Sequence, residues 1–468
     1  MLFSSMIFLW LFLPVVFIGY RLLDNRYKNM FLLIASLLFY AWGEPRFILI
    51  MLTIIAINYI FGILVDKEDI LFRKKIYLAV SILINLSFLG YFKYYNFFAR
   101  NVNRLLGEDF ISIRNIVLPI GISFYTFQAL SYVIDLYRKE IPVQKNIFDL
   151  ALYISFFPQL IAGPIIKYRD VQKQIQERVL LPSKTAYGIK RFIYGLTKKV
   201  LLANTFAQTA DRILSADTAS LSTPVVWFGM ILYTLQIYYD FSGYSDMAIG
   251  LGKMFGFDFL ENFNYPYIAA SIRDFWRRWH ISLSTWFKEY VYIPLGGNRA
   301  GKARTYFNLI IVFLATGLWH GASFNFIVWG LYYGFFLVIE RMFLGRWLDK
   351  NKFKLLNHVY TILVVVTGWV FFRAEGMRHA FNLLKIMFIP KSGTVTILTY
   401  ADAKLIILLI SGILLCGILQ KLIKKLFNAL YNQDRGYIME NAAMFILLFI
   451  DIILLINNTY NPFIYFRF

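Results

Sequence analysis

Two histidines stand in surroundings that are unusual for ionisable side chains. His320 closes an apolar run over residues 306–319, and His280 follows a stretch rich in tryptophan and arginine at residues 273–279. An imidazole can accept or release a proton near neutral pH, so it suits general acid–base catalysis. His320 and His280 are therefore the candidate catalytic residues, whereas His358 and His379 have ordinary explanations at a helix end and in a polar loop.

The position of His320 follows from the length of its apolar run. Fourteen helical residues rise about 21 Å, and a bilayer's hydrocarbon core is about 30 Å thick. Starting from the basic cluster at residues 299–304, His320 should end within the apolar zone. An ionisable residue there is a functional candidate by default, and the alternative is a neutral histidine that donates one hydrogen bond in a helix bundle.

His280 belongs to a segment that helical spacing predicts to be amphipathic. Trp276, His280 and Ser284 are expected on one helix face. One interpretation is an interfacial helix anchored by tryptophan and arginine. The other is a cytoplasm-facing vestibule for a phosphorylated cofactor, because arginine forks pair with phosphate oxygens. The candidate cofactor-binding residues are Arg273, Arg277, Arg278 and Lys288. Their alternative role is to set topology and contact anionic lipid.

The elements that must position these residues are membrane helices. Of 468 residues, 59% are hydrophobic and only 16% are charged, which predicts an all-α polytopic membrane protein. Disorder is excluded by the apolar content, and a disulfide-built fold is excluded by the single cysteine, Cys416, which we interpret as a core filler. The net charge of +21 suggests basic cytoplasmic loops, not nucleic-acid binding.

The apolar runs predict about 11 crossings. They lie near residues 5–20, 30–42, 46–65, 76–92, 116–134, 148–166, 192–206, 225–250, 306–319, 324–340, 356–372, 403–420 and 441–457. Basic residues after the first, third and fifth runs place the N-terminus outside, although Lys93, Arg100 and Arg104 count against this orientation. Runs broken by glycine and proline, such as residues 156–164, predict re-entrant segments around an internal chamber. No linker divides the chain, so one membrane domain over residues 1–468 is expected.

A few polar residues interrupt the run at 225–250. Asp240, Ser242 and Asp246 are candidates to line a tunnel, together with Trp319, and hydrogen bonding between helices is the equal alternative. Other catalytic arrangements are not expected. The sequence has no Gly-x-Ser-x-Gly elbow, no strand-and-helix context for a phosphate loop and no histidine or cysteine spacing typical of a metal site.

Several segments resemble a known family. Residues 273–299, RDFWRRWHISLSTWFKEYVYIPLGGNR, and LWHG at 318–321 strongly resemble the membrane-bound O-acyltransferases, and within them the alginate O-acetylase branch. Further matches are PIGISFYTFQALSYVIDLYR (119–138), FFPQLIAGPI (156–165), YYDFSGYSDMAIGLGKMFGF (238–257), GWVFFRAE (368–375) and FIYFRF (463–468). The signature therefore covers about residues 119–375, and the chain is also similar to the D-alanyl-transfer protein of teichoic acid synthesis. Arg467 departs from the glutamine that is usual in the tail of the branch.

The resemblance implies a ring of helices around a thinner centre, with His320 as the family's catalytic histidine and His280 as the nearby second histidine. It implies an O-acetyltransferase of the bacterial cytoplasmic membrane that uses acetyl-CoA as a substrate and holds no permanent cofactor. An extracytoplasmic partner with a serine-hydrolase-like (SGNH) fold is expected to place the acetyl group on a polysaccharide. The alternatives are a transporter or flippase of polysaccharide precursors, although no repeat typical of transporters is visible, and a lipid acyltransferase of the same superfamily.

Overall fold

A computed structural model gives the fold of residues 1–299, 301–419, 422, 425, 435–457 and 460–462. All regular structure in these residues is helical, which confirms the all-α prediction. Contacts divide the chain into two compact units, Met1–Phe192 with Met247–Leu260, and Ile193–Asp246 with Glu261–Phe468. Arg467, singled out in the sequence, lies outside the described residues.

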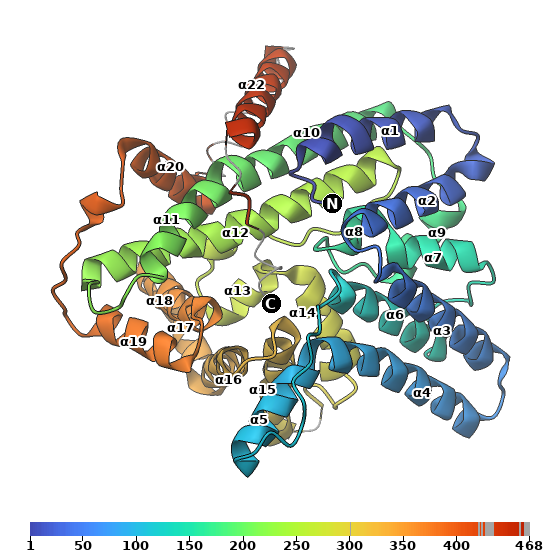
Figure 1. The fold of residues 1–468 in the computed structure, drawn as a ribbon, viewed down its shortest axis with the longest axis horizontal. Coiled ribbons are helices and arrows are strands. Elements are labelled where there is room, and N and C mark those ends of the chain that lie inside the picture. Colours follow the sequence, from blue (N-terminus) through green and yellow to red (C-terminus); the bar gives the residue numbers. More distant parts are fainter. Residues whose placement is uncertain (300, 420–421, 423–424, 426–434, 458–459, 463–468) are drawn as a thin grey trace. The chain divides into compact units, whose positions relative to one another are not determined.

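The first unit contains the N-terminal helices (Figure 1). They are the π-helical η1 (Phe8–Phe12), α1 (Leu13–Leu22), α2 (Asn25–Gly43), α3 (Ile48–Lys67), α4 (Leu71–Leu89), the π-helical η2 (Gly90–Tyr94), α5 (Tyr95–Leu106), α6 (Ile122–Tyr137), α7 (Ile147–Ser155), α8 (Phe157–Leu160), α9 (Tyr168–Gln176) and most of α10 (Pro182–Thr197).

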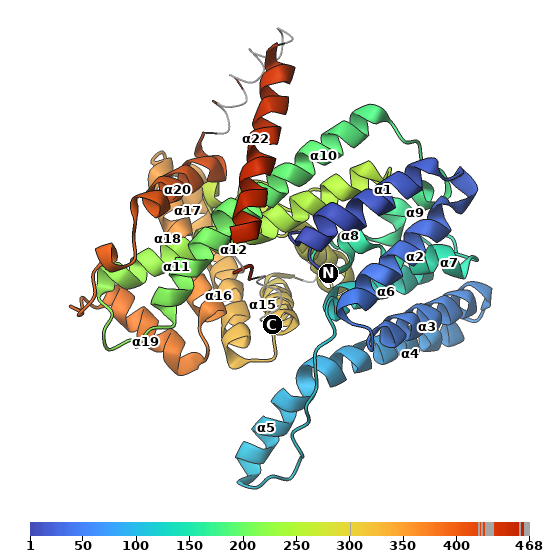
Figure 2. The same cartoon turned by 45° about the horizontal axis from the view of Figure 1, so that its top comes forward.

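Helices α3, α4 and α6 lie side by side in this unit (Figure 2). The buried amides of Asn58 on α3 and Asn85 on α4 donate to each other's oxygens at 2.9 and 3.1 Å. Polar side chains often join membrane helices in this way, because helices surrounded by lipid have no hydrophobic driving force to associate. Gly62 leaves room for the ring of Tyr132 on α6, which a methyl group there would approach to 3.0 Å.

The run at residues 156–164 is broken, as its glycines and prolines predict. Helix α7 ends at Ser155 and regular helix resumes only at Tyr168, apart from the single turn of α8, yet the chain between is buried. Side chains form hydrogen bonds with backbone groups that the broken helix leaves without partners. Ser36 Oγ accepts from the Phe157 amide at 3.1 Å, and Tyr153 donates to the Ile166 carbonyl at 2.9 Å. Such irregular backbone is tolerated at membrane depth only when protein or a wet cavity surrounds it.

The second unit contains the remaining helices and both candidate histidines. Its elements are the π-helical η3 (Lys198–Ala203), α11 (Asn204–Leu214), α12 (Thr223–Met254, up to the unit boundary), η4 (Pro266–Ile268), α13 (Ile272–Arg278), α14 (Ile281–Phe287), η5 (Lys288–Tyr292), α15 (Gly301–His320), α16 (Phe324–Ile339), η6 (Glu340–Leu344), α17 (Gly345–Lys350), α18 (Lys354–Arg373), α19 (Met377–Phe388), η7 (Ile397–Thr399), α20 (Ala403–Ile413), η8 (Leu414–Ile418) and α22 (Arg435–Asn457).

Aromatic side chains form the centre of this second unit. Trp329, Tyr333 and Trp369 are at most 1% exposed, and Trp276 packs edge-on against Trp329 at 5.6 Å between ring centroids. Interlocked rings of this kind are large and stiff, so they bury much apolar area and hold their neighbours in fixed orientations. Cys416 is also buried in this unit, which confirms its interpretation as a core side chain.

Five described helices are long and apolar enough to cross a membrane, Ile48–Lys67, Leu71–Leu106, Phe324–Lys350, Lys354–Arg373 and Gly436–Asn457. Two shorter apolar helices are Phe8–Leu22 and Ala403–Ile418. Large apolar side chains are exposed along these helices, for example Leu49, Phe445 and Phe449. The chain is therefore a multi-pass membrane protein, whereas the expected count of about 11 crossings is not confirmed.

Candidate active site

His320 is the last residue of α15, where the apolar run predicted it. Its side chain is buried, with 6% exposed, and α15 packs tightly along α16. Gly317 makes this approach possible, because a methyl group there would lie 2.2 Å from the Phe326 carbonyl oxygen. The ring of His320 packs edge-on against Trp329 at 5.1 Å and Phe372 at 5.0 Å between centroids. Rigid neighbours thus fix its orientation.

His280 lies at a break in the chain, so the prediction that Trp276, His280 and Ser284 share one helix face is wrong. Trp279 is extended and His280 has a left-handed backbone with φ 44°, between the end of α13 and the start of α14. The break arises because the chain pairs with an upstream segment. The Asn264 amide donates to the Arg278 carbonyl at 2.9 Å, and the Ile281 amide donates to the Asn262 carbonyl at 2.9 Å. A residue other than glycine in this conformation costs energy that the surroundings must supply.

Trp319 connects the two histidines. Its ring centroid lies 6.0 Å from that of His280 and 4.9 Å from that of His320, with both imidazoles tilted steeply to the indole. The two imidazoles are therefore no further apart than the sum of these distances, although 40 positions separate them in the sequence. The structure brings together the two residues that the sequence singled out, and Trp319 contacts both of them.

A hydrogen-bond network fixes the tautomer of His280. Asn262 Oδ1 accepts from the Ser282 amide at 3.1 Å and from Ser282 Oγ at 2.9 Å, which identifies this atom as the amide oxygen. His280 Nδ1 lies 3.1 Å from the same oxygen and must therefore carry the proton. His280 Nε2 is then the unprotonated nitrogen, and no described residue forms a hydrogen bond with it.

Burial also sets the charge of His280, which lies outside the five candidate spans. Its side chain is 1% exposed, and the loss of water around it lowers its pKa from 6.5 to about 3. The ring is therefore neutral at physiological pH. A neutral imidazole with an unprotonated Nε2 can accept a hydrogen bond there, and it has no proton to donate from that nitrogen.

A model of the membrane-bound O-acyltransferase family matches residues 79–380. The chain belongs to this family. The probable alginate O-acetylase AlgI of Pseudomonas aeruginosa is 46% identical over 392 residues, which cover 83% of this chain and 75% of that protein. The peptidoglycan O-acetyltransferase of Helicobacter pylori is 38% identical over 421 residues, covering 83% and 80%. The teichoic acid D-alanyltransferase of Bacillus subtilis is 29% identical over 276 residues, covering 55% and 67%. The protein is thus a membrane acyltransferase.

Two residues of this acyltransferase that position the site were missed in the sequence. Asn262 orients His280, and its amide nitrogen donates to Ser245 Oγ at 3.0 Å. Glu340 is buried, and its carboxylate accepts from the amides of Ile272 at 2.6 Å and Arg273 at 2.9 Å, where α13 begins. A carboxylate suits the positive end of a helix. No local pattern marks either residue, since both act on partners at least 17 positions away.

The candidate cofactor-binding residues lie on α13 and at the start of η5. Arg273 pairs with Asp349 at 3.3 Å, and Arg278 pairs with Asp274 at 3.0 Å. Arg277 and Lys288 are exposed. Helical spacing puts Arg273 and Arg277 on one face of α13, opposite the buried Phe275. Their role toward a donor stays a prediction.

The acidic residues of α12 are buried and paired with lysines of η3. Asp240 Oδ1 lies 2.7 Å from Lys199 Nζ with both side chains 2% exposed, and Asp246 Oδ2 lies 2.5 Å from Lys198 Nζ. Ser242 is buried on the same helix. These ion pairs join α12 to η3. They resemble the polar contact between helices that the sequence offers as the alternative to a tunnel lining, with charged groups in place of neutral ones. A place along a tunnel stays a prediction for Asp240, Ser242, Asp246 and Trp319.

Proposed function

We propose that this acyltransferase takes acetyl groups from cytoplasmic acetyl-CoA and passes them outward for O-acetylation of an extracellular or cell-wall polysaccharide. The observation that carries the proposal is the pair of buried histidines whose rings both pack against Trp319. The names of its relatives supply the substrate class. The two O-acetyl-transferring relatives match 83% of the chain at 46% and 38% identity, whereas the D-alanyltransferase matches 55% at 29% identity. This difference favours acetyl over D-alanyl transfer.

We assign His320 as the general base. It removes the proton of the acceptor hydroxyl while the oxygen attacks the thioester carbonyl carbon. The carbon–sulfur bond then breaks, and the same proton returns to the thiolate of the leaving coenzyme. Acid–base help of this kind contributes about 10²–10⁴-fold. The proton taken from the hydroxyl is the one given to the thiolate, so the reaction needs no other proton donor or acceptor.

We assign an orienting role to His280. Its protonated Nδ1 is held by Asn262 Oδ1, and its free Nε2 accepts a hydrogen bond from the reacting groups or from water between them. The low pKa that burial imposes makes this role more suitable than proton donation to the leaving thiol. The sequence alone does not decide which of the two histidines is the base and which orients the reacting groups.

The donor and acceptor reach the site from opposite faces in this proposal. Arg273 and Arg277, together with Arg278 and Lys288, hold the phosphates and adenine of the donor on the cytoplasmic side. About 11 helices form a ring around a central tunnel in the bacterial cytoplasmic membrane. A separate extracytoplasmic protein with a serine-hydrolase-like fold receives the acetyl group and places it on the polymer, as the resemblance to the alginate O-acetylase branch implies.

The test of this function is to measure the O-acetyl content of the polysaccharides of the bacterium that carries the gene. Cells lacking the gene should lose ester-linked acetate from one extracellular or wall polymer, and the wild-type chain should restore it. The His320→Ala and His280→Ala variants should not restore it at equal protein levels. The control His379→Ala should restore it, because His379 is half-buried in the first turn of α19, and not in the loop that the sequence suggests. Unchanged acetate in every polymer of the deletion strain would contradict the proposal.

A further inference from the structure

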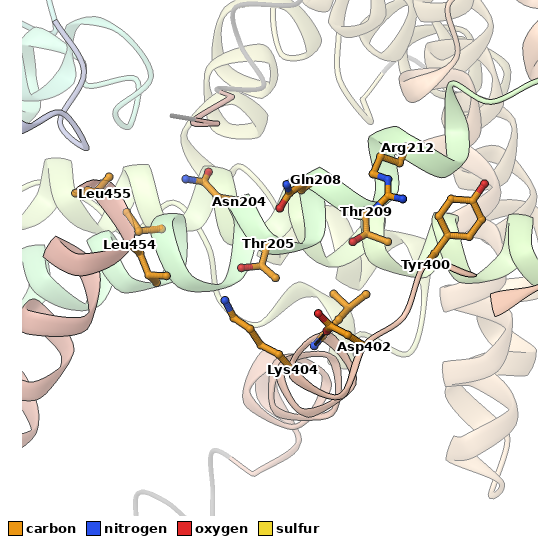
Figure 3. Close-up of a pocket in the computed structure, with 12 residues that line it drawn as sticks. Asn204, Thr205, Gln208, Thr209, Arg212, Tyr400, Asp402, Lys404, Leu454 and Leu455 are labelled. Carbon is orange, nitrogen blue, oxygen red and sulfur yellow. Dashed lines mark hydrogen bonds between the residues drawn. The ribbon is translucent and has the colours of Figure 1, made fainter. Parts of the chain in front are cut away.

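A polar cavity of about 290 Å³ lies within the second unit, away from the two histidines in the fold. It is lined by one face of α11, by the segment that leads into α20, and by the last turns of α22 (Figure 3). The lining residues are Val200, Asn204, Thr205, Gln208, Thr209, Arg212, Tyr400, Asp402, Lys404, Leu405, Leu454 and Leu455. Neither the family match nor the proposed chemistry explains this cavity.

The cavity has an excess of positive charge. Arg212 and Lys404 both line it, and neither forms an ion pair with a described residue. The single acidic side chain in the lining, Asp402, caps α20 by accepting from the Leu405 amide at 2.7 Å. Two cations and one carboxylate give the lining a net charge of about +1, which one bound anionic group would neutralise. Arginine and lysine both form strong charge-assisted hydrogen bonds with phosphate.

A buried amide gives a second, independent indication of a ligand. Asn204 is 5% exposed and lines the cavity, and no described residue forms a hydrogen bond with its Oδ1. Its Nδ2 donates to Asn461 Oδ1 at 3.2 Å, which leaves the oxygen as the atom that needs a donor. A buried polar atom without a partner is costly, so a ligand hydroxyl beside it would be stabilising.

The remaining walls are apolar and belong to membrane helices. Leu454 and Leu455 lie in the last turn of α22, a candidate span, and Leu405 lies in the first turn of the apolar helix α20. Exposed isoleucines continue along both helices, among them Ile407, Ile410 and Ile456. Such surfaces suit acyl chains.

The basic residues Lys421, Lys424 and Lys425 stand between these two helices in the sequence. Cytoplasmic loops collect such residues, so the opposite ends of α20 and α22, and the cavity with them, belong to the outer face of the membrane.

We infer that this cavity binds the headgroup of an anionic phospholipid of the outer leaflet, with hydroxyls on the headgroup, as in phosphatidylglycerol. The phosphate lies between Arg212 and Lys404, and the glycerol hydroxyls donate to Asn204 Oδ1 and contact Gln208 and Thr209. A sugar ligand is less suited, because the ring of Tyr400 is already covered by the Arg212 guanidinium at 5.6 Å. The bound lipid would hold α11 to the segment after α22 through the Asn204–Asn461 contact.

Native mass spectrometry of the purified full chain tests this inference. The protein is exchanged into detergent with equal amounts of phosphatidylglycerol and phosphatidylcholine, and the retained lipid is counted. The wild type should retain phosphatidylglycerol in preference to phosphatidylcholine. The double variant Arg212→Gln/Lys404→Gln should retain it about a hundredfold less, since each of the two charge-assisted bonds is worth about tenfold. The matched control Arg346→Gln/Lys350→Gln removes one exposed arginine and one exposed lysine elsewhere in the unit and should bind as the wild type does.

Three further measurements show whether the bound anion is a lipid headgroup, a free phosphate or a polymer, and whether the result depends on a misfolded variant. Glycerol 1-phosphate in solution should bind far more weakly than the lipid, because it lacks acyl chains. If the double variant fails to fold, Lys404→Gln alone should still weaken retention, since this side chain is exposed. Equal retention of both lipids, or retention unaffected by these variants, would overturn the inference. Binding of an acidic oligosaccharide that depends on Arg212, with no lipid preference, would instead assign the cavity to a polymer.

Discussion

Replacement of Asn262 by aspartate tests how the site controls His280. The carboxylate keeps an oxygen 3.1 Å from His280 Nδ1 and can still accept from Ser282, while Ser245 Oγ can rotate to donate to the other oxygen. The hydrogen bonds are therefore preserved, and the new feature is a negative charge beside the imidazole.

The size of the effect follows from that contact. An opposite charge at this distance raises a histidine pKa by about 1–3 units. Burial holds the pKa of His280 at about 3 in the wild type, so the variant's value rises to about 4–6. At the upper end of that range, the neutral form of His280 falls about tenfold at pH 5, whereas it stays fully populated in the wild type.

The assay is thiol release from acetyl-CoA by the protein in nanodiscs, measured between about pH 5 and 8. The Asn262→Asp variant should gain an acidic limb in its rate profile that the wild type lacks, with near-normal turnover at the alkaline end. Asn264→Asp is the matched control, because Asn264 is exposed and two positions away. Identical profiles for Asn262→Asp and the wild type would refute the argument that His280 acts as a neutral hydrogen-bond acceptor oriented by Asn262.

Three other perturbations have defined outcomes. Gly317→Ala places a methyl group 2.2 Å from the Phe326 carbonyl, so it should lower the thermal midpoint and reduce turnover by displacing His320. Lys199→Met removes a cation 2.7 Å from buried Asp240 and should cost about 3–5 kcal/mol of stability. Burial of neutral His280 means that the unfolded chain binds more protons between about pH 3 and 6.5, so stability should rise with pH up to about 6.5 and level off above it. His280→Gln should flatten this slope, which is at most about 1.4 kcal/mol per pH unit.

Each of these has its own control. Gly334→Ala should be mild, because the nearest atom to its methyl group lies at 3.4 Å. Equal effects of the two alanine substitutions would show that the packing at Gly317 is not specific. Adding Asp240→Asn to Lys199→Met should recover part of the lost stability, and no recovery would argue against the ion pair as the cause. A His280→Gln protein with the full wild-type pH slope would show that other groups produce it.

The sequence predicts best those features that depend on local composition. The end of α15 at His320 follows from the length of one apolar run, and the break after Ser155 follows from glycine and proline. His280 was placed on a continuous helix because the spacing of residues 273–284 is helical. Hydrogen bonds to Asn262 and Asn264 override that local preference, and no local pattern reveals them.

The same distinction applies to the charged residues. Asp240 and Asp246 were recognised as unusual in an apolar helix, but their lysine partners lie more than 40 positions earlier in the chain. Glu340 went unnoticed because its task is to accept from the start of α13, which only the folded unit brings near it. Tertiary pairing of this kind was visible only in the structure.

The most direct measurement of the central claim is coenzyme release from acetyl-labelled acetyl-CoA by the purified protein, alone and with the proposed extracytoplasmic partner and polymer. The proposed roles predict release by the wild type, loss of about 10²–10⁴-fold in His320→Ala, and a smaller loss in His280→Ala. Release that persists unchanged in His320→Ala, or no release by the wild type with all components present, would contradict the account.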